Sequence, residues 1–241
     1  MSAMPSTGEV TQQRKVRWLS SVCFLLTAAL LLAASVLQQA ASVQRWVTLV
    51  ESVPEDIIFA EDHRYDYFFP SGSWVNYGSV TGQHSLAMLL LTLGMISLTF
   101  GVVAQTKSAP RIRILTEYSL SAVVVAWFGI SSLHVYLSGA IGTPSILQYM
   151  GILGALASLA GLALSILWWG RAPAAAIGCL LLMGSTTIGY VIAFMLIAPI
   201  FVGYTSHDTT PWAESVIAAT TGAASLAVLV AAVLALRKKR A

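Results

Sequence analysis

The chain has 241 residues, of which 57% are apolar and only 10% are charged. An average soluble domain carries about 25% charged residues, and the mean hydropathy of this chain is +0.78. The composition excludes an ordinary soluble globule, a disordered chain and a nucleic-acid-binding protein, and it predicts an integral membrane protein. The net charge of +3 does not indicate nucleic acid, because the basic residues border long apolar segments.

Six segments of the chain are long and apolar enough to form transmembrane helices, which need about 20 residues each. They are residues 18–37, 84–104, 115–137, 146–168, 174–202 and 214–236. The fifth is long enough to tilt or to kink near Pro199. We therefore predict an all-α integral membrane protein, a six-helix transmembrane bundle that forms one polytopic domain over residues 1–241.

The Lys and Arg residues indicate the orientation, because cytoplasmic loops carry an excess of them. With a cytoplasmic N-terminus, all of the 13 basic residues except Arg45 and Arg64 lie on the cytoplasmic side. All of the 10 acidic residues except Glu9 and Glu117 then lie outside. This predicts an N-in/C-in topology with both termini in the cytoplasm. We interpret the basic clusters as topology signals that also contact anionic lipid headgroups.

The two ends of this topology carry further expectations. Residues 1–13 are polar and are expected to form a flexible cytoplasmic tail. The chain is rich in Ala and has a single Asn, Asn76. That composition is typical of a high-GC bacterium, so we expect a multi-pass protein of the bacterial cytoplasmic (inner) membrane.

Residues 38–83, between the first two spans, form the only large segment predicted to lie outside the membrane. Their aromatic content is unlike that of a disordered linker, so we predict an ordered outer loop that caps the bundle. Within it, residues 42–53 have apolar positions at helical spacing and predict a short amphipathic helix that ends at Pro54. Three roles stay open for the loop: a lid that closes the bundle, a docking surface for a membrane or envelope protein, and a substrate-gating lid. The candidate partner-binding residues are Tyr65, Tyr67, Phe68, Phe69, Trp74 and Tyr77.

All four histidines fall on the outer side in this topology, and several have acidic neighbours. Imidazole and carboxylate groups together suit zinc or copper, and two histidines on facing helices suit haem. The second and third spans are expected to be neighbours, which would bring His84 towards His134. Hydrogen bonding, pH sensing and proton transfer are the alternative roles. The candidate metal or haem ligands are His63, His84, His134, His207, Asp62, Asp66 and Asp208.

The predicted membrane interior contains no charge near its middle, where ion-coupled transporters usually carry one. Glu117, near the inner interface, is expected to pair with Arg113 four residues before it. The interior polar groups are mainly hydroxyls, and those of residues 184–190 fall in the middle of the fifth span. They predict close helix packing or, alternatively, a path for a neutral solute.

The sequence favours a non-catalytic protein and leaves the question of enzyme activity open. Asp62, His63 and Asp66 have the residue types of an acid–base site, but no nucleophile motif accompanies them. The first hypothesis is an accessory or assembly subunit that docks a membrane or envelope partner through the outer loop. The alternatives are a haem- or metal-binding redox protein, with haem or a transition metal as cofactor, and a small-solute transporter or channel. The expected partners are membrane lipid and other membrane or envelope proteins, and no nucleic acid.

Overall fold

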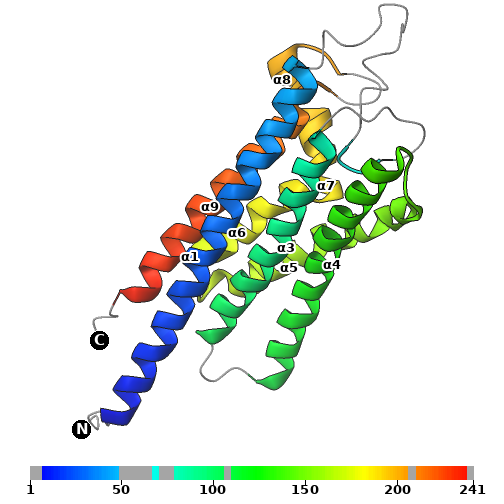
Figure 1. The fold of residues 1–241 in the computed structure, drawn as a ribbon. Coiled ribbons are helices and arrows are strands. Elements are labelled where there is room, and N and C mark those ends of the chain that lie inside the picture. Colours follow the sequence, from blue (N-terminus) through cyan, green and yellow to red (C-terminus); the bar gives the residue numbers. More distant parts are fainter. Residues whose placement is uncertain (1–6, 49–66, 71–78, 106–109, 206–209, 238–241) are drawn as a thin grey trace, which may run out of the picture.

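The computed structural model describes residues 7–48, 67–70, 79–105, 110–205 and 210–237, and this part of the chain contains helices and no strand (Figure 1). The long helices are α1 (Thr7–Val43), α3 (Val80–Ala104), α4 (Arg111–Ile141), α5 (Gly151–Trp169) and α9 (Ala213–Leu236). The shorter ones are η1 (Gln44–Thr48), η3 (Ile146–Met150), α6 (Pro173–Leu182), η4 (Met183–Ser185), α7 (Thr187–Ile192), η5 (Ala193–Ile197) and α8 (Ala198–Val202). The all-α prediction is confirmed for the described residues.

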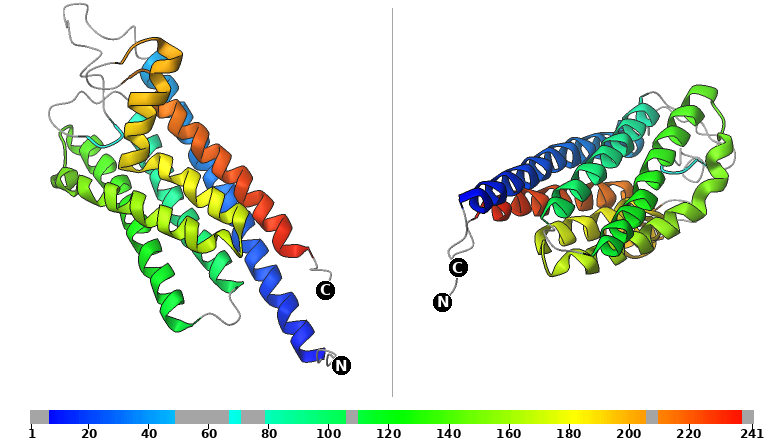
Figure 2. Two further views of the ribbon diagram at one scale, coloured as in Figure 1. Left: turned by 180° about the vertical axis from the view of Figure 1, so that it is seen from behind. Right: turned by 90° about the horizontal axis from the view of Figure 1, so that it is seen from below.

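The long helices and α6 pack as a closed ring. Each contacts the next in the order α1, α3, α4, α5, α6 and α9, and α9 returns to α1. The view from below (Figure 2, right) shows α1 and α9 side by side, although they come from the two ends of the chain. We call the end of the bundle where α1 begins and α9 ends the terminal end, and the other end the distal end (Figure 1).

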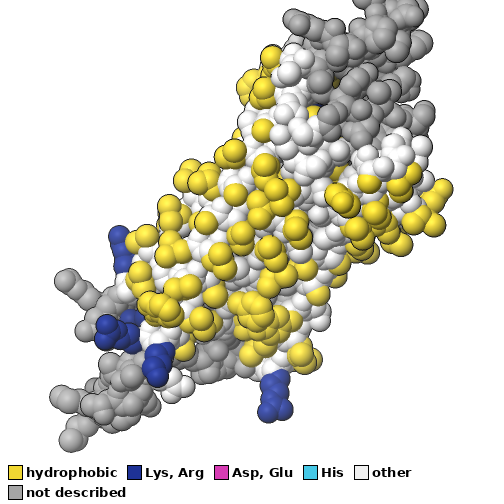
Figure 3. All heavy atoms as spheres, in the orientation of Figure 1, with side chains coloured by type: hydrophobic (Ala, Val, Ile, Leu, Met, Phe, Trp, Pro, Cys, Tyr) yellow, Lys and Arg dark blue, Asp and Glu magenta, His cyan; other side chains and the backbone are white. Residues whose placement is uncertain are grey.

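The surface of the bundle suits a membrane. Five helical segments are long and apolar enough to cross one, namely residues 14–48, 80–104, 111–141, 146–169 and 213–236. Exposed apolar side chains cover the face drawn in Figure 3 along most of its length, and the basic side chains in that view lie at the terminal end. No part of the chain that the structure describes covers these outward-facing apolar side chains. They are therefore suited to contact the hydrocarbon of a membrane. The protein is therefore a multi-pass membrane protein.

Hydroxyl groups join the helices inside the ring. The Ser225 hydroxyl of α9 donates a hydrogen bond to the Ala28 carbonyl of α1 at 2.8 Å, and the Ser97 hydroxyl of α3 donates to the Cys23 carbonyl at 2.9 Å. Bonds of this kind, with small residues at the contacts, replace the hydrophobic driving force that is absent between helices in lipid. Apolar side chains, including Phe24, Leu91 and Trp127, fill the remaining interior.

The first helix is longer at both ends than the sequence predicted. Residues 7–13, expected in a flexible tail, belong to α1, and residues 38–48, expected in the outer loop, continue it without a break into the π-helical turn η1. The separate amphipathic helix predicted from residue 42 is therefore wrong in its start. Gln38, Ser42 and Arg45 lie in this stretch, and all three side chains are buried.

The fifth apolar segment, predicted over residues 174–202, is broken rather than gently kinked. The part Pro173–Ser185 meets the part Thr187–Val202 at an angle of 71°. The first part ends in the 3-10 turn η4. Thr186, between the two parts, has extended backbone, with φ −112° and ψ 171°. The large bend thus lies at Thr186 and not near Pro199, which is in the first turn of α8. The π-helical turn η5 directly before α8 accommodates the ring.

Candidate functional site

The aromatic segment 67–70 lies at the distal end, packed into the bundle. Tyr67 is only 1% exposed and Phe68 is also buried. The Tyr67 ring meets the His84 ring edge-on with 5.0 Å between the centroids, and the Phe68 ring stacks on Tyr190 at 4.5 Å. Phe69 is partly buried and stacks on Trp127 at 5.3 Å. These three candidate partner-binding residues therefore act as anchors; Tyr65, Trp74 and Tyr77 lie outside the described residues.

His134 of α4 holds this segment through one ring nitrogen and Ser145 through the other. Nε2 lies 2.8 Å from the Pro70 carbonyl oxygen, which can only accept a hydrogen bond, so Nε2 is the donor. Nδ1 lies 2.7 Å from the Ser145 hydroxyl, which is then the donor to the neutral ring. Both imidazole nitrogens of His134 are therefore engaged by hydrogen bonds within the protein.

His84 differs from His134 in its surroundings. It is buried, and neither ring nitrogen has a hydrogen-bond partner among the residues that the structure describes. Gln38, Tyr67, Phe68 and Glu214 surround the same narrow space, which has no room for a water molecule. Within the described residues no three His, Cys, Asp or Glu side chains are grouped to hold a metal. The other candidate ligands, His63, His207, Asp62, Asp66 and Asp208, lie outside that part of the chain.

A buried ion pair joins the first and last helices at the distal end, and the sequence did not predict it. Arg45 pairs with Glu214, and both side chains are almost fully buried. The Trp46 indole nitrogen donates to the other Glu214 carboxylate oxygen at 2.8 Å. The Arg45 guanidinium also lies over the Trp46 ring, 4.6 Å from its centroid. The sequence signals it only through Glu214, in the first turn of the last span, and Arg45, which follows the first predicted span.

A second ionic cluster lies at the terminal end around the buried Glu117. The predicted pair with Arg113 is confirmed, at 3.2 Å. Arg171, between α5 and α6, also pairs with Glu117. Arg113 in addition donates to the Leu167 carbonyl at 2.9 Å, so the cluster joins α4 to the end of α5.

Hydroxyl groups satisfy the backbone at the break between α6 and α7. The Thr186 hydroxyl donates to the Met183 carbonyl at 2.6 Å and lies 2.6 Å from the Ser158 hydroxyl of α5. The amide of Ile188 donates to the Ser158 hydroxyl at 3.3 Å. The Trp127 indole donates to the Ser185 carbonyl at 3.0 Å. Non-helical backbone at membrane depth is tolerated only where protein groups satisfy it in this way.

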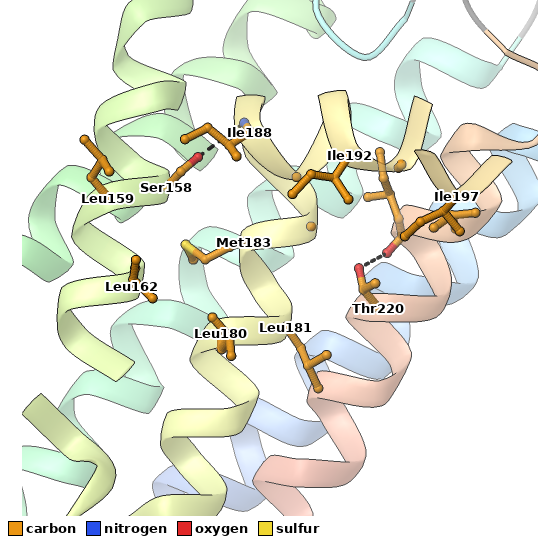
Figure 4. A pocket seen from close by; sticks show the side chains of 15 residues that line it. Ser158, Leu159, Leu162, Leu180, Leu181, Met183, Ile188, Ile192, Ile197 and Thr220 are labelled. Carbon is orange, nitrogen blue, oxygen red and sulfur yellow. Dashed lines mark hydrogen bonds between the residues drawn. The ribbon is translucent and has the colours of Figure 1, made fainter. Parts of the chain in front are cut away.

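The bend also opens a pocket of about 360 Å³ on the side of the bundle (Figure 4). Its walls come from α5, α6, the bend itself, α7, η5 and α9. The side chains drawn around it are mainly Leu, Ile and Met, and no charged residue lines it. The sequence placed residues 184–190 at mid-span and left open a path for a neutral solute there, and three of these residues, Gly184, Ile188 and Gly189, line this lateral cavity.

Among the described residues, two features distinguish this fold from a plain helical bundle. They are the aromatic and ionic contacts at the distal end and the broken span. Comparison of the chain with models of protein families, with curated proteins and with solved structures finds no match.

Proposed function

We propose that the protein is a non-catalytic accessory or assembly subunit of a bacterial cytoplasmic membrane, which docks another membrane or envelope protein at its distal end. The observation that carries this proposal is the anchoring of residues 67–70. Phe68 and Tyr190 stack, and His134 holds the Pro70 carbonyl, so the middle of the long connection between α1 and α3 has a fixed position. A fixed anchor lowers the entropy cost of presenting the neighbouring aromatic residues to a partner.

We further propose six spans, with the bent segment crossing as one. Arg171 pairs with Glu117 of α4 at the terminal end, and Glu214 pairs with Arg45 at the distal end. The chain between Arg171 and Glu214 therefore passes from one end of the bundle to the other. An even number of spans places the start of α1 and the end of α9 on the same side of the membrane.

The distribution of basic residues supports an N-in/C-in orientation for this proposal. Lys and Arg mark the cytoplasmic side of membrane proteins. Of the described basic residues, only Arg45 lies at the distal end, and it is buried against Glu214. The others lie near the helix ends that form the terminal end: Arg14, Lys15, Arg17, Arg111, Arg113, Arg171 and Arg237.

The broken span is the one feature that favours the transporter alternative, because secondary transporters bind substrate at discontinuous helices. In this chain the Ser158 and Thr186 hydroxyls at the break bond to the protein itself, and the adjacent pocket is apolar. A polar solute would find few groups there to replace its hydration. We therefore rank a transporter below a docking subunit.

Mild-detergent purification of the tagged protein from its native membrane, followed by mass spectrometry, tests the proposal. We expect a stoichiometric partner that is lost from the double variant Trp74→Ala/Tyr77→Ala. Tyr149→Ala is the matched control, because Tyr149 is an aromatic residue that is 77% exposed at the same end; that variant should keep the partner. Retention of the partner by the double variant, or its absence from the unmodified protein, would overturn the proposal.

A further inference from the structure

The pocket beside the broken span opens sideways, onto the apolar surface of the bundle. Leu159 and Leu162 of α5, Leu180 of α6, and Ile188 and Ile192 of α7 line it, and each of these side chains is also exposed on the outer surface. Figure 4 shows them arranged around the bend between α6 and α7. The pocket is therefore continuous with the surface that faces membrane lipid, and it is reached without crossing the protein.

The chemistry of the lining selects a hydrocarbon occupant. Only Ser158 and Thr220 bring hydroxyls to the wall, and each already donates to a carbonyl of its own helix, at 2.9 Å and 2.8 Å. A polar headgroup in this pocket would lose its hydration and gain little in return. The volume of about 360 Å³ falls within the range of about 300–1,000 Å³ that is usual for small-molecule sites.

The bend that forms the pocket is built into the packing of three glycines. Gly161 faces the Met183 side chain, Gly184 faces Thr220, and Gly189 lies against the Met183 carbonyl; a Cβ at any of them would overlap its neighbour. Close contacts therefore fix the inner side of the bend between α6 and α7, while its outer side stays open. This makes the pocket a fixed hollow and not a gap between loosely packed side chains.

We propose that this pocket binds one acyl chain of a membrane phospholipid, which enters from the side and lies between α5 and α7. The headgroup stays outside the pocket at the membrane interface, because nothing in the lining would pair with it. The site is independent of partner docking, which concerns the distal end.

Photolabelling tests the proposal on the full-length protein in lipid nanodiscs. The probe is a phosphatidylcholine with a diazirine in the middle of one acyl chain, and labelled peptides are quantified by mass spectrometry. We expect labelling to concentrate at residues 159–162 and 188–192. The variants Leu162→Trp and Leu180→Trp, both at half-exposed positions, place a larger side chain in the pocket. Each should lower that labelling by about tenfold, equivalent to about 1.4 kcal/mol.

The control variant is Leu226→Trp, on an exposed position of α9 that does not line the pocket. It should leave the labelling at residues 159–162 and 188–192 unchanged. Labelling spread evenly over exposed positions of α1, α3 and α9 would show ordinary surface lipid and overturn the proposal. Undiminished labelling in both folded pocket variants would overturn it as well. Loss of the docking partner has no bearing on either result.

Discussion

Buried charges at the ends of the bundle connect helices that are far apart in the sequence. Arg45 and Glu214 join α1 to α9 at the distal end, and Glu117 joins α4 to Arg171 at the terminal end. Removing the carboxylate of such a pair costs more than replacing both members by apolar groups, because the guanidinium group stays buried without the carboxylate that compensated its desolvation. The pairs therefore specify which helices meet, whatever their net contribution to stability.

The first prediction concerns the distal pair. Glu214→Leu leaves the Arg45 cation buried beside Trp46, and we expect the free energy of unfolding to fall by about 3–5 kcal/mol. The double variant Arg45→Met/Glu214→Leu should recover much of that loss. Denaturant titration in mixed micelles measures both. If the double variant is less stable than Glu214→Leu alone, the pair does not determine the contact between α1 and α9.

A second prediction concerns the cluster at the terminal end. Glu117→Gln keeps the shape of the side chain but removes the charge that Arg113 and Arg171 share. We expect a loss of about 1.5–3 kcal/mol in the free energy of unfolding, as for hydrogen bonds to charged groups. Arg111→Gln is the control, since Arg111 is exposed at the start of the same helix; it should change stability by less than about 0.5 kcal/mol. Equal effects of the two would contradict the assignment.

Among the helices, the broken fifth segment shows how local chemistry overrides apolar length. Residues 174–202 are continuous in hydropathy, yet the helix stops at Leu182 and starts again at Thr187. Sharp bends in helices have identifiable causes, among them Gly and Ser pairs and π-helical turns. The first occurs at this bend, as Gly184 with Ser185, whereas the π-helical turn η5 lies further along, at residues 193–197.

The third prediction tests the bend at Gly189. A Cβ at this position would overlap the Met183 carbonyl oxygen, which belongs to the backbone and cannot rotate away. We expect Gly189→Ala to lower the free energy of unfolding by about 1–3 kcal/mol, the usual cost of overpacking. At Gly82, in the first turns of α3, a Cβ meets nothing within 4 Å. Gly82→Ala should therefore be neutral or stabilising by up to about 1 kcal/mol. A neutral Gly189→Ala would mean that the bend does not depend on this contact.

The sequence predicted the elements that depend on local composition. Spans are visible because 20 apolar residues in a row are a local property, and the Glu117–Arg113 pair because its members are four residues apart. Burial of Arg45 depends on Glu214, 169 residues further along the chain, so no local pattern indicates it. Gly184, Ser185 and Thr187 were visible as small and polar residues, but helix packing and a helix break use the same residue types. The break, rather than close packing of a continuous helix, depends on Ser158 of α5, whose hydroxyl accepts a hydrogen bond from the Ile188 amide.

At the scale of the whole molecule, the ring of helices places chemically distinct surfaces at opposite ends. The terminal end carries exposed basic residues such as Arg14 and Lys15, and the distal end carries the aromatic anchor with Tyr67 and Phe68 buried. Between them lies the lateral pocket. A partner protein, the cytoplasmic lipid headgroups and a lipid chain would thus meet three separate parts of the surface.

The fourth prediction tests the proposed orientation with single cysteines in a Cys23→Ala/Cys179→Ala background. Thr143, in the turn after α4, and Gln12, in the first turns of α1, are both exposed. In intact cells with a permeable outer layer, a membrane-impermeant maleimide should label Thr143→Cys directly. Gln12→Cys should react only after the membrane is permeabilised. The reverse pattern would place both termini outside and refute the positive-inside assignment.

The break at Thr186 also bears on how the chain enters the membrane during synthesis. α6 has 10 residues, which rise about 15 Å, half of the roughly 30 Å hydrocarbon core. A half-helix of that length with an open turn after it cannot be released alone into lipid, because its uncapped amides need partners. Ser158, which caps Ile188, precedes the break in the chain, whereas Thr221, which meets Ser185, follows it. We therefore expect the fifth segment to leave the insertion machinery against α5, and its last polar contacts at the break to form only once α9 has been made.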